Sequence, residues 1–182
     1  MTVNNPDVRD RLLGSLRKAD RKLAVHMEER YDTDIADLWS AITEPDRLAR
    51  WVARVEGELA PGGTFQAIFT SGWEGAGRVD VCEAPHRLRV TLSPGQADQT
   101  MIEAELIPDG KMTRLVMEEC GISIDDAAGY GAGWQTHLED LATHLAGRER
   151  GAWQDRVVEL LPTYKALASR LGDAGTSGTD GS

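Results

Sequence analysis

The sequence predicts an α+β fold in which an antiparallel β-sheet packs one face against a long C-terminal helix. Between residues 22 and 118, short segments alternate apolar and charged residues, as strands with one buried face do. Turn residues separate these segments, for example Pro61–Gly63 and Pro108–Lys111. Beyond residue 123 the apolar residues recur at intervals of three and four, which indicates helices. At 182 residues, the chain is long enough for one domain with a substantial core.

Residues 1–20 are expected to form an N-terminal extension that contains a short strand or hairpin, because a turn at Ala19–Asp20 separates two extended runs. The main domain is predicted to span residues 21–147. It begins with a strand in which apolar and polar residues alternate from Lys22 to Tyr31.

Two short helices are predicted after this strand. Ile35, Leu38, Trp39 and Ile42 have helical spacing, and Asp34 is placed to cap the helix that contains them. Pro45 suits the first position of the second helix, over residues 45–51.

Five further strands follow. In each, the apolar residues at every second position define a buried face: Phe65, Ala67 and Phe69; Gly77, Val79 and Val81; Leu88, Val90 and Leu92; Ile102, Ala104 and Leu106; Thr113, Leu115 and Met117.

The long helix is predicted to start near Ser123–Asp126 and to carry an apolar stripe of Trp134, Leu138, Leu141 and Leu145. Its first half contains Gly129, Gly131 and Gly133, although each interior glycine costs a helix about 1 kcal/mol relative to alanine. We interpret these glycines as positions where a missing Cβ lets the helix approach the sheet closely, with Trp134 filling the space beneath.

A second amphipathic helix is predicted over residues 148–171. Its stripe runs through Trp153, Val157, Leu160, Tyr164, Leu167 and Leu171, and Pro162 is expected to kink it. The helix either packs on its own domain or binds a partner, which would be a second copy of the chain or another protein. The glycine-rich tail, residues 172–182, is expected to be disordered.

Composition excludes several function classes. The net charge of −10, from 20 basic and 30 acidic residues, argues against a nucleic-acid partner. No run approaches the ~18 apolar residues of a membrane helix, so no membrane insertion is expected. The first residues lack the apolar core of a signal peptide, and Cys82 and Cys120 form no CxxC motif. A cytoplasmic location is therefore predicted.

Motifs for cofactors are absent or incomplete. In GYGAGW, residues 129–134, Trp134 stands where a dinucleotide fingerprint needs its third glycine, and there is no P-loop, HExxH or G-x-S-x-G segment. His137, Asp140 and His144 share one helical face, but they flank the apolar stripe, which favours a solvated helix edge over a metal site. We expect neither a metal nor a cofactor.

Two carboxylates continue the apolar faces of their strands, Glu29 after Met27 and Glu119 after Met117. A buried carboxylate needs a partner or a raised pKa. The two side chains are therefore either polar anchors or an acid/base pair in a cavity, or they reach water or pair with arginine at the strand ends.

Four blocks of sequence resemble a known family. They are DLWSAITEPDRLARW at 37–51, GELAPGGTF at 57–65, GRVDVCEAPHRLRVTL at 77–92, and TRLVMEECGI at 113–122 with YGAGWQTHLEDLATHL at 130–145. In this order they resemble the activator-of-heat-shock-protein-90-ATPase homologues of the START-like (SRPBCC) superfamily, over about residues 20–147. The family often has a histidine in its last strand, where this sequence has Glu119.

The resemblance implies a helix-grip fold, in which a curved antiparallel sheet wraps around a long C-terminal helix and two short helices follow the first strand. It also implies an internal cavity between the sheet and the helix for a small apolar or aromatic molecule. Because the sequence contains no complete catalytic constellation, we expect this molecule to be bound without catalysis. A protein-interaction module and a cyclase, dehydratase or hydrolase that uses Glu29 and Glu119 are the alternatives. The residues expected to line the cavity are Met27, Tyr31, Trp51, Phe65, Phe69, Trp73, Val79, Leu88, Val90, Ile102, Leu115, Met117, Tyr130, Trp134 and Leu138.

Overall fold

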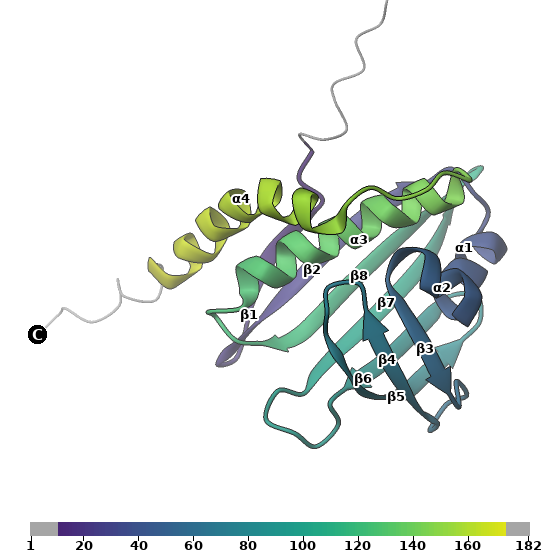
Figure 1. The fold of residues 1–182 in the computed structure, drawn as a ribbon, viewed down its shortest axis with the longest axis horizontal. Coiled ribbons are helices and arrows are strands. Elements are labelled where there is room, and N and C mark those ends of the chain that lie inside the picture. The colour runs from purple at the N-terminus through teal and green to yellow at the C-terminus, as the bar shows by residue number, and fades with distance from the viewer. Residues whose placement is uncertain (1–10, 174–182) are drawn as a thin grey trace, which may run out of the picture.

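The structure is a computed structural model that describes residues 11–173. Within these residues, eight antiparallel strands form one sheet in the order β1-β2-β8-β7-β6-β5-β4-β3. The sheet curves around the long helix α3, and α1 and α2 lie at the end of the sheet opposite α4 (Figure 1). The predicted fold class is therefore confirmed.

The strands are β1 (Gly14–Ala19), β2 (Lys22–Tyr31), β3 (Ala53–Gly57), β4 (Thr64–Phe69), β5 (Glu74–Glu83), β6 (Arg87–Leu92), β7 (Thr100–Asp109) and β8 (Met112–Ile122). The helices are α1 (Ile35–Thr43), α2 (Pro45–Trp51), α3 (Ala127–Leu145) and α4 (Trp153–Asp173). Asp34 caps α1 by accepting a hydrogen bond from the Asp37 backbone N–H, and Pro45 begins α2, as the sequence predicts.

Two strands change the predicted organisation. β3 was not predicted. Its five residues, of which Ala53 is buried, are too few for an alternation of apolar and charged residues to be recognised. β1 pairs with β2 along its whole length, from Gly14 opposite Met27 to Ala19 opposite Lys22. The sheet therefore begins before residue 21, and the predicted boundary at residue 20 falls inside a hairpin. The first ten residues of the predicted extension lie outside the described part of the chain.

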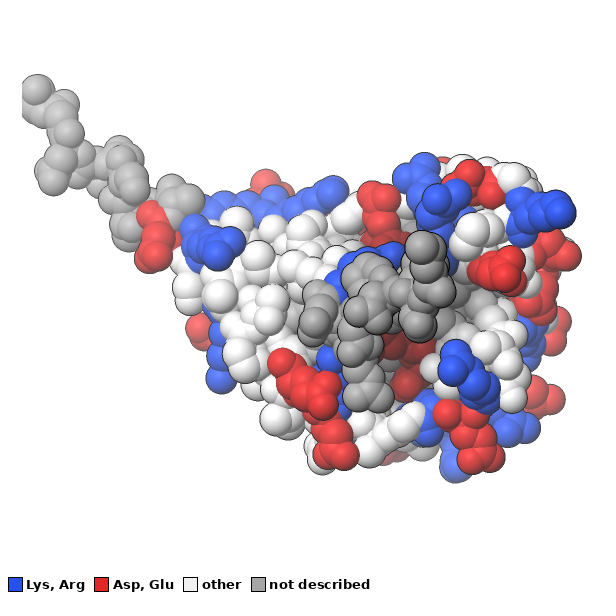
Figure 2. Space-filling view, turned by 90° about the horizontal axis from the view of Figure 1, so that it is seen from above, with Lys and Arg blue, Asp and Glu red and all other residues white. Residues whose placement is uncertain are grey.

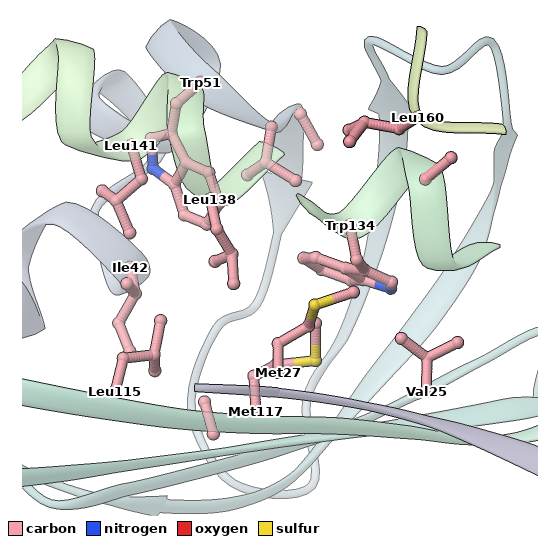
Figure 3. Close-up of a cluster of buried hydrophobic side chains, with 14 of the residues drawn as sticks. Val25, Met27, Ile42, Trp51, Leu115, Met117, Trp134, Leu138, Leu141 and Leu160 are labelled. Atoms are coloured by element: carbon pink, nitrogen blue, oxygen red, sulfur yellow. The ribbon is translucent and has the colours of Figure 1, made fainter. Parts of the chain in front are cut away.

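The core lies between the concave face of the sheet and α3. Figure 3 shows that Trp134 projects from α3 towards Met27 and Met117, and that Leu138 lies beside Trp51 further along the helix. The Trp51 indole N–H donates to the Ala41 carbonyl oxygen at 3.0 Å, which ties α2 to α1 beside this cluster. The long helix thus packs on sulfur-containing side chains of β2 and β8 and on an aromatic side chain of α2.

The helix α4 packs on the outer side of α3 and against β1 (Figure 1). Its Leu160 and Tyr164 are buried, and the Tyr164 hydroxyl donates to Gln135 Oε1 on α3 at 2.8 Å. Arg156 forms two hydrogen bonds to the Glu139 carboxylate, at 2.7 and 2.9 Å. The predicted apolar stripe therefore packs within the chain, while a partner on the outer face of α4 stays a prediction. Pro162, where a kink was predicted, lies inside a helix that continues on both sides.

Gly131 and Gly133 of α3 lie towards α4 and Gly129 faces open space, so our interpretation that these glycines face the sheet is wrong. A Cβ atom at Gly131 would overlap the ring of Tyr164, and one at Gly133 would lie 3.4 Å from the Trp153 ring. A Cβ at Gly129 would meet nothing within 4 Å. The close approach that lacks room for a side chain is thus between α3 and α4, at Gly131.

The surface over α3 and α4 carries acidic and basic residues around a broad uncharged area (Figure 2). No helix in residues 11–173 is long and apolar enough to cross a lipid bilayer. Of the predicted disordered tail, residues 174–182 lie outside the described part of the chain.

Candidate functional site

Two adjoining cavities lie in the described structure, with volumes of about 520 Å³ and about 150 Å³. Phe69, Leu92 and Trp134 line both of them, so the Trp134 indole stands at their boundary. The larger cavity opens between α3, α4 and the β4–β5 turn. The smaller one lies deeper, between the sheet, α2 and α3.

Thirteen of the fifteen residues predicted to line a cavity do line one of these two. Trp73 and Tyr130 line the larger cavity, and Phe69 and Trp134 line both. The residues that line only the smaller cavity are Trp51, Phe65, Val79, Leu88, Val90, Ile102, Leu115, Met117 and Leu138.

Met27 and Tyr31 lie outside both cavities, because α3 packs directly on their strand β2 and Tyr164 of α4 reaches Met27. Met27 is fully buried, with its sulfur 3.8 Å from the Tyr164 hydroxyl oxygen. The Tyr31 hydroxyl donates to the Leu138 carbonyl oxygen at 3.1 Å. These two side chains pack the sheet against the helices.

Glu119 brings a carboxyl group to the wall of the larger cavity while only 2% of the residue is exposed. Its two oxygens accept hydrogen bonds from the Thr100 hydroxyl at 2.7 Å and from the Trp134 indole N–H at 2.5 Å. Burial raises the pKa of Glu119, and these two hydrogen bonds to the carboxylate partly oppose the rise. The group is a polar anchor inside a largely aromatic wall.

Glu29 is not brought together with Glu119. In the β2–β8 ladder Glu29 lies opposite Leu115, whereas Glu119 lies opposite Val25. Four strand residues separate the two positions, roughly 13 Å along the sheet. Glu29 lines neither cavity and instead accepts hydrogen bonds from Arg11 and from the Arg30 backbone N–H. The cavities therefore hold one of the two carboxylates.

His137 lies at the centre of the aromatic wall. Its ring centroid lies 5.6 Å from that of Trp134, 5.3 Å from that of Trp153 and 6.2 Å from that of Phe69. Its Nδ1 is 3.3 Å from the Trp51 carbonyl oxygen, which can only accept, so Nδ1 carries a proton. Burial lowers the pKa of His137 from 6.5 to about 4, and the ring is neutral at pH 7.

The sequence predicted that His137, Asp140 and His144 lie on a solvated edge of the long helix. This prediction is wrong for two of the three residues. His137 is 3% exposed and Asp140 is 7% exposed, because α2, α4 and the segment after α3 cover that side of the helix. Burial raises the pKa of Asp140 to about 6. His144 is half-buried and accepts a hydrogen bond from Arg47 Nε at 3.2 Å. The three side chains thus interact with different neighbours.

Comparison with known proteins identifies the family to which this architecture belongs. The family model described as Activator of Hsp90 ATPase homolog 1-like protein matches residues 32–146. The chain belongs to this family. No curated protein matches the sequence.

Solved structures share the fold. The crystal structure of CalU16 from Micromonospora echinospora has a TM-score of 0.70 and 25% identity, covering 85% of this chain and 95% of that one. DynU16, from the dynemicin biosynthetic locus, has a TM-score of 0.63 and 23% identity, covering 70% of this chain and 48% of its own. MLL2253 from Mesorhizobium loti has a TM-score of 0.60 and 24% identity, covering 68% of this chain and 96% of its own.

The segment matched by the Activator of Hsp90 ATPase homolog 1-like family does not contain the whole wall of the larger cavity. Trp153, Leu161 and Lys165 come from α4, which follows residue 146. None of the three was predicted as a cavity residue, although Trp153 begins the apolar stripe that marks this helix. Ser71 and Gly133 were also missed, because a turn residue and a glycine carry no sequence signal for a cavity. Leu92 was missed although it lies on the predicted buried face that contains Leu88 and Val90.

We expect His137 to make this family member less stable in acid. A base whose pKa is lower in the folded state contributes stability above its unfolded pKa of 6.5, and loses it as the pH falls towards about 4. The shift corresponds to roughly 3 kcal/mol of unfolding free energy. Urea unfolding at pH 7 and pH 4 should therefore show a larger loss for the wild type than for His137→Gln.

Asp140, one turn along α3, titrates in the same range with the opposite sign, because its pKa is raised. The difference between wild type and His137→Gln cancels this contribution, since both proteins contain Asp140. Equal losses of stability in the two proteins would contradict a neutral, buried His137.

Proposed function

We propose that this protein binds a small apolar or aromatic molecule in the two cavities and does not convert it chemically. The observation that carries the proposal is the pair of adjoining cavities with a buried carboxyl group, Glu119, at the wall near their boundary. Ligand sites in proteins are typically concave, mostly apolar and supplied with few polar groups, and they measure about 300–1,000 Å³. The larger cavity matches this description.

The smaller cavity supports an apolar ligand group. The described residues that line it have apolar side chains, with the exception of Thr43, Cys82 and the indole N–H groups of Trp51 and Trp134. An unfilled apolar space of about 150 Å³ forgoes packing on the order of 3–4 kcal/mol. A ligand that extends an apolar group past Trp134 would recover part of that packing.

Binding without catalysis is proposed because the predicted acid/base pair is not assembled. General acid/base chemistry on one substrate needs both groups within hydrogen-bonding reach of it. Glu29 is hydrogen-bonded outside the cavities, and Glu119 is held by Thr100 and Trp134. We also propose a cytoplasmic location, which the unpaired thiols of Cys82 and Cys120 support.

Binding of N-phenyl-1-naphthylamine, a neutral probe that fluoresces in apolar surroundings, tests the proposal. Wild-type protein is expected to bind the probe, and Gly133→Leu is expected to bind it roughly tenfold more weakly. Gly133 lines the larger cavity, and a side chain there would project between α3 and Trp153.

Ala142→Leu is the matched control, since it adds the same side chain to an exposed position of α3 outside both cavities. Circular dichroism establishes that each variant is folded. Lack of binding by wild type would overturn the proposed function. Equal binding by wild type and Gly133→Leu would show that the probe sits elsewhere.

A further inference from the structure

The walls of the larger cavity are rich in aromatic rings. Phe69 and Trp73 come from the β4–β5 region, Tyr130 and Trp134 from α3, and Trp153 from α4. Phe69 and Trp73 meet edge to face with centroids 5.4 Å apart. Aromatic ring faces carry negative potential and attract cations, most strongly where water is excluded. Five such rings from separate elements surround this cavity.

The carboxyl group of Glu119 has unused capacity for hydrogen bonds. An ionised carboxylate accepts about four hydrogen bonds, and the described partners of Glu119, Thr100 and Trp134, supply two. Both partners are neutral, so they leave the negative charge without a counter-ion. A buried charge without a counter-ion is costly, and a cation entering from the cavity would compensate it.

Charge at the cavity mouth has the same sign as Glu119. Asp125 and Asp126 line the cavity where β8 leads into α3, and both are exposed. Lys165 on α4 is the single lysine or arginine among the described residues that line the cavity, and His137 is neutral at pH 7. The whole chain has a net charge of −10. Such a charge distribution draws cations towards the opening.

We propose that the ligand of the larger cavity is an apolar or aromatic molecule with a protonated amine, which pairs with Glu119 and lies against the surrounding rings. This inference rests on the proposed function and specifies the class of its ligand. The amine donates hydrogen bonds to the free lone pairs of the Glu119 carboxylate. The rest of the molecule occupies the aromatic space and extends towards the smaller cavity.

Two probes with one carbon skeleton test the amine directly. 4-Phenylbutylamine is protonated at neutral pH, and 4-phenylbutan-1-ol is its uncharged counterpart. Isothermal titration calorimetry of wild-type protein is expected to show roughly tenfold or tighter binding of the amine over the alcohol. In Glu119→Gln this preference is expected to fall to about threefold or less. Glu29→Gln removes a carboxylate outside the cavities and is expected to keep the wild-type preference.

A second measurement needs no variant. Because burial raises the pKa of Glu119, lowering the pH protonates this carboxyl group more readily than an ordinary glutamate, whereas the amine, with a pKa of about 10, keeps its proton. The preference of wild-type protein for 4-phenylbutylamine should therefore shrink as the pH is lowered. Circular dichroism and thermal unfolding at each pH establish that the protein is folded.

The outcomes separate this inference from the proposed function. If amine and alcohol bind equally, or the alcohol binds more tightly, the amine inference is overturned and the proposed function stands. The inference is also overturned if Glu119→Gln keeps the full preference, because the amine then lies elsewhere. Failure of the amine to bind overturns the inference, and simultaneous failure of N-phenyl-1-naphthylamine overturns the proposed function as well.

Discussion

Trp134→Ala is expected to lower the free energy of unfolding by roughly 4–6 kcal/mol. Only 8% of Trp134 is exposed, and its indole fills the space between α3 and the sheet at the boundary of the two cavities (Figure 3). The truncation removes this packing and also removes the N–H donor of the buried Glu119. Because small domains are stable by only about 5–15 kcal/mol, urea unfolding should reveal a strongly destabilised protein.

Trp134→Phe separates the two contributions. Phenylalanine keeps much of the packed ring but cannot donate to Glu119, and its expected cost is about 1–3 kcal/mol. A loss below about 2 kcal/mol for Trp134→Ala would contradict a packing role for the indole. Equal losses for the two variants would assign the whole effect to the hydrogen bond with Glu119.

The second large effect is expected at Gly131. Alanine normally favours a helix interior over glycine by about 1 kcal/mol, yet Gly131→Ala is expected to lower the unfolding free energy by roughly 1–3 kcal/mol. The reason is that the new methyl group would overlap the ring of Tyr164, so α4 would have to move away from α3. Tyr164 would then lose its hydrogen bond with Gln135.

Gly129→Ala is the matched control in the same helix. A Cβ at Gly129 meets nothing within 4 Å, so this variant should be about 0.5–1 kcal/mol more stable than wild type. Urea unfolding measures both variants, and hydrogen exchange of α4 reports whether that helix has detached. A stabilised Gly131→Ala protein with unchanged exchange in α4 would contradict the close packing of Tyr164 on α3.

Sequence patterns could predict the layers of this fold because they report which side of each element is buried. Alternation in β2 and β4–β8, together with the helix-start signals Asp34 and Pro45, was enough to place the sheet, the short helices and α3. The curvature of the sheet was predicted from the family resemblance. The resemblance also supplied most of the lining residues, since residues on the concave face of a curved sheet necessarily surround any space beneath the helix.

The sequence could not show which elements approach each other most closely. The glycines of α3 were expected to face the sheet, but Gly131 accommodates a tyrosine from a helix whose position the pattern left open. His137 was assigned to a solvated edge because helical spacing cannot indicate that α4 covers that edge. The distance between Glu29 and Glu119 likewise depends on the register of β2 and β8. That register cannot be deduced from the observation that both residues continue the apolar faces of their strands.

The position of α4 has a consequence for how the proposed ligand preference of such a chain could change in evolution. Strands β3–β8 and helix α3 lie within the segment that matches the family, whereas part of the wall of the larger cavity is supplied by α4, which follows that segment. Substitutions at Trp153, Leu161 or Lys165 would therefore reshape the opening of the larger cavity without changing any residue of the sheet. The scaffold and the selectivity of the proposed site would then change separately.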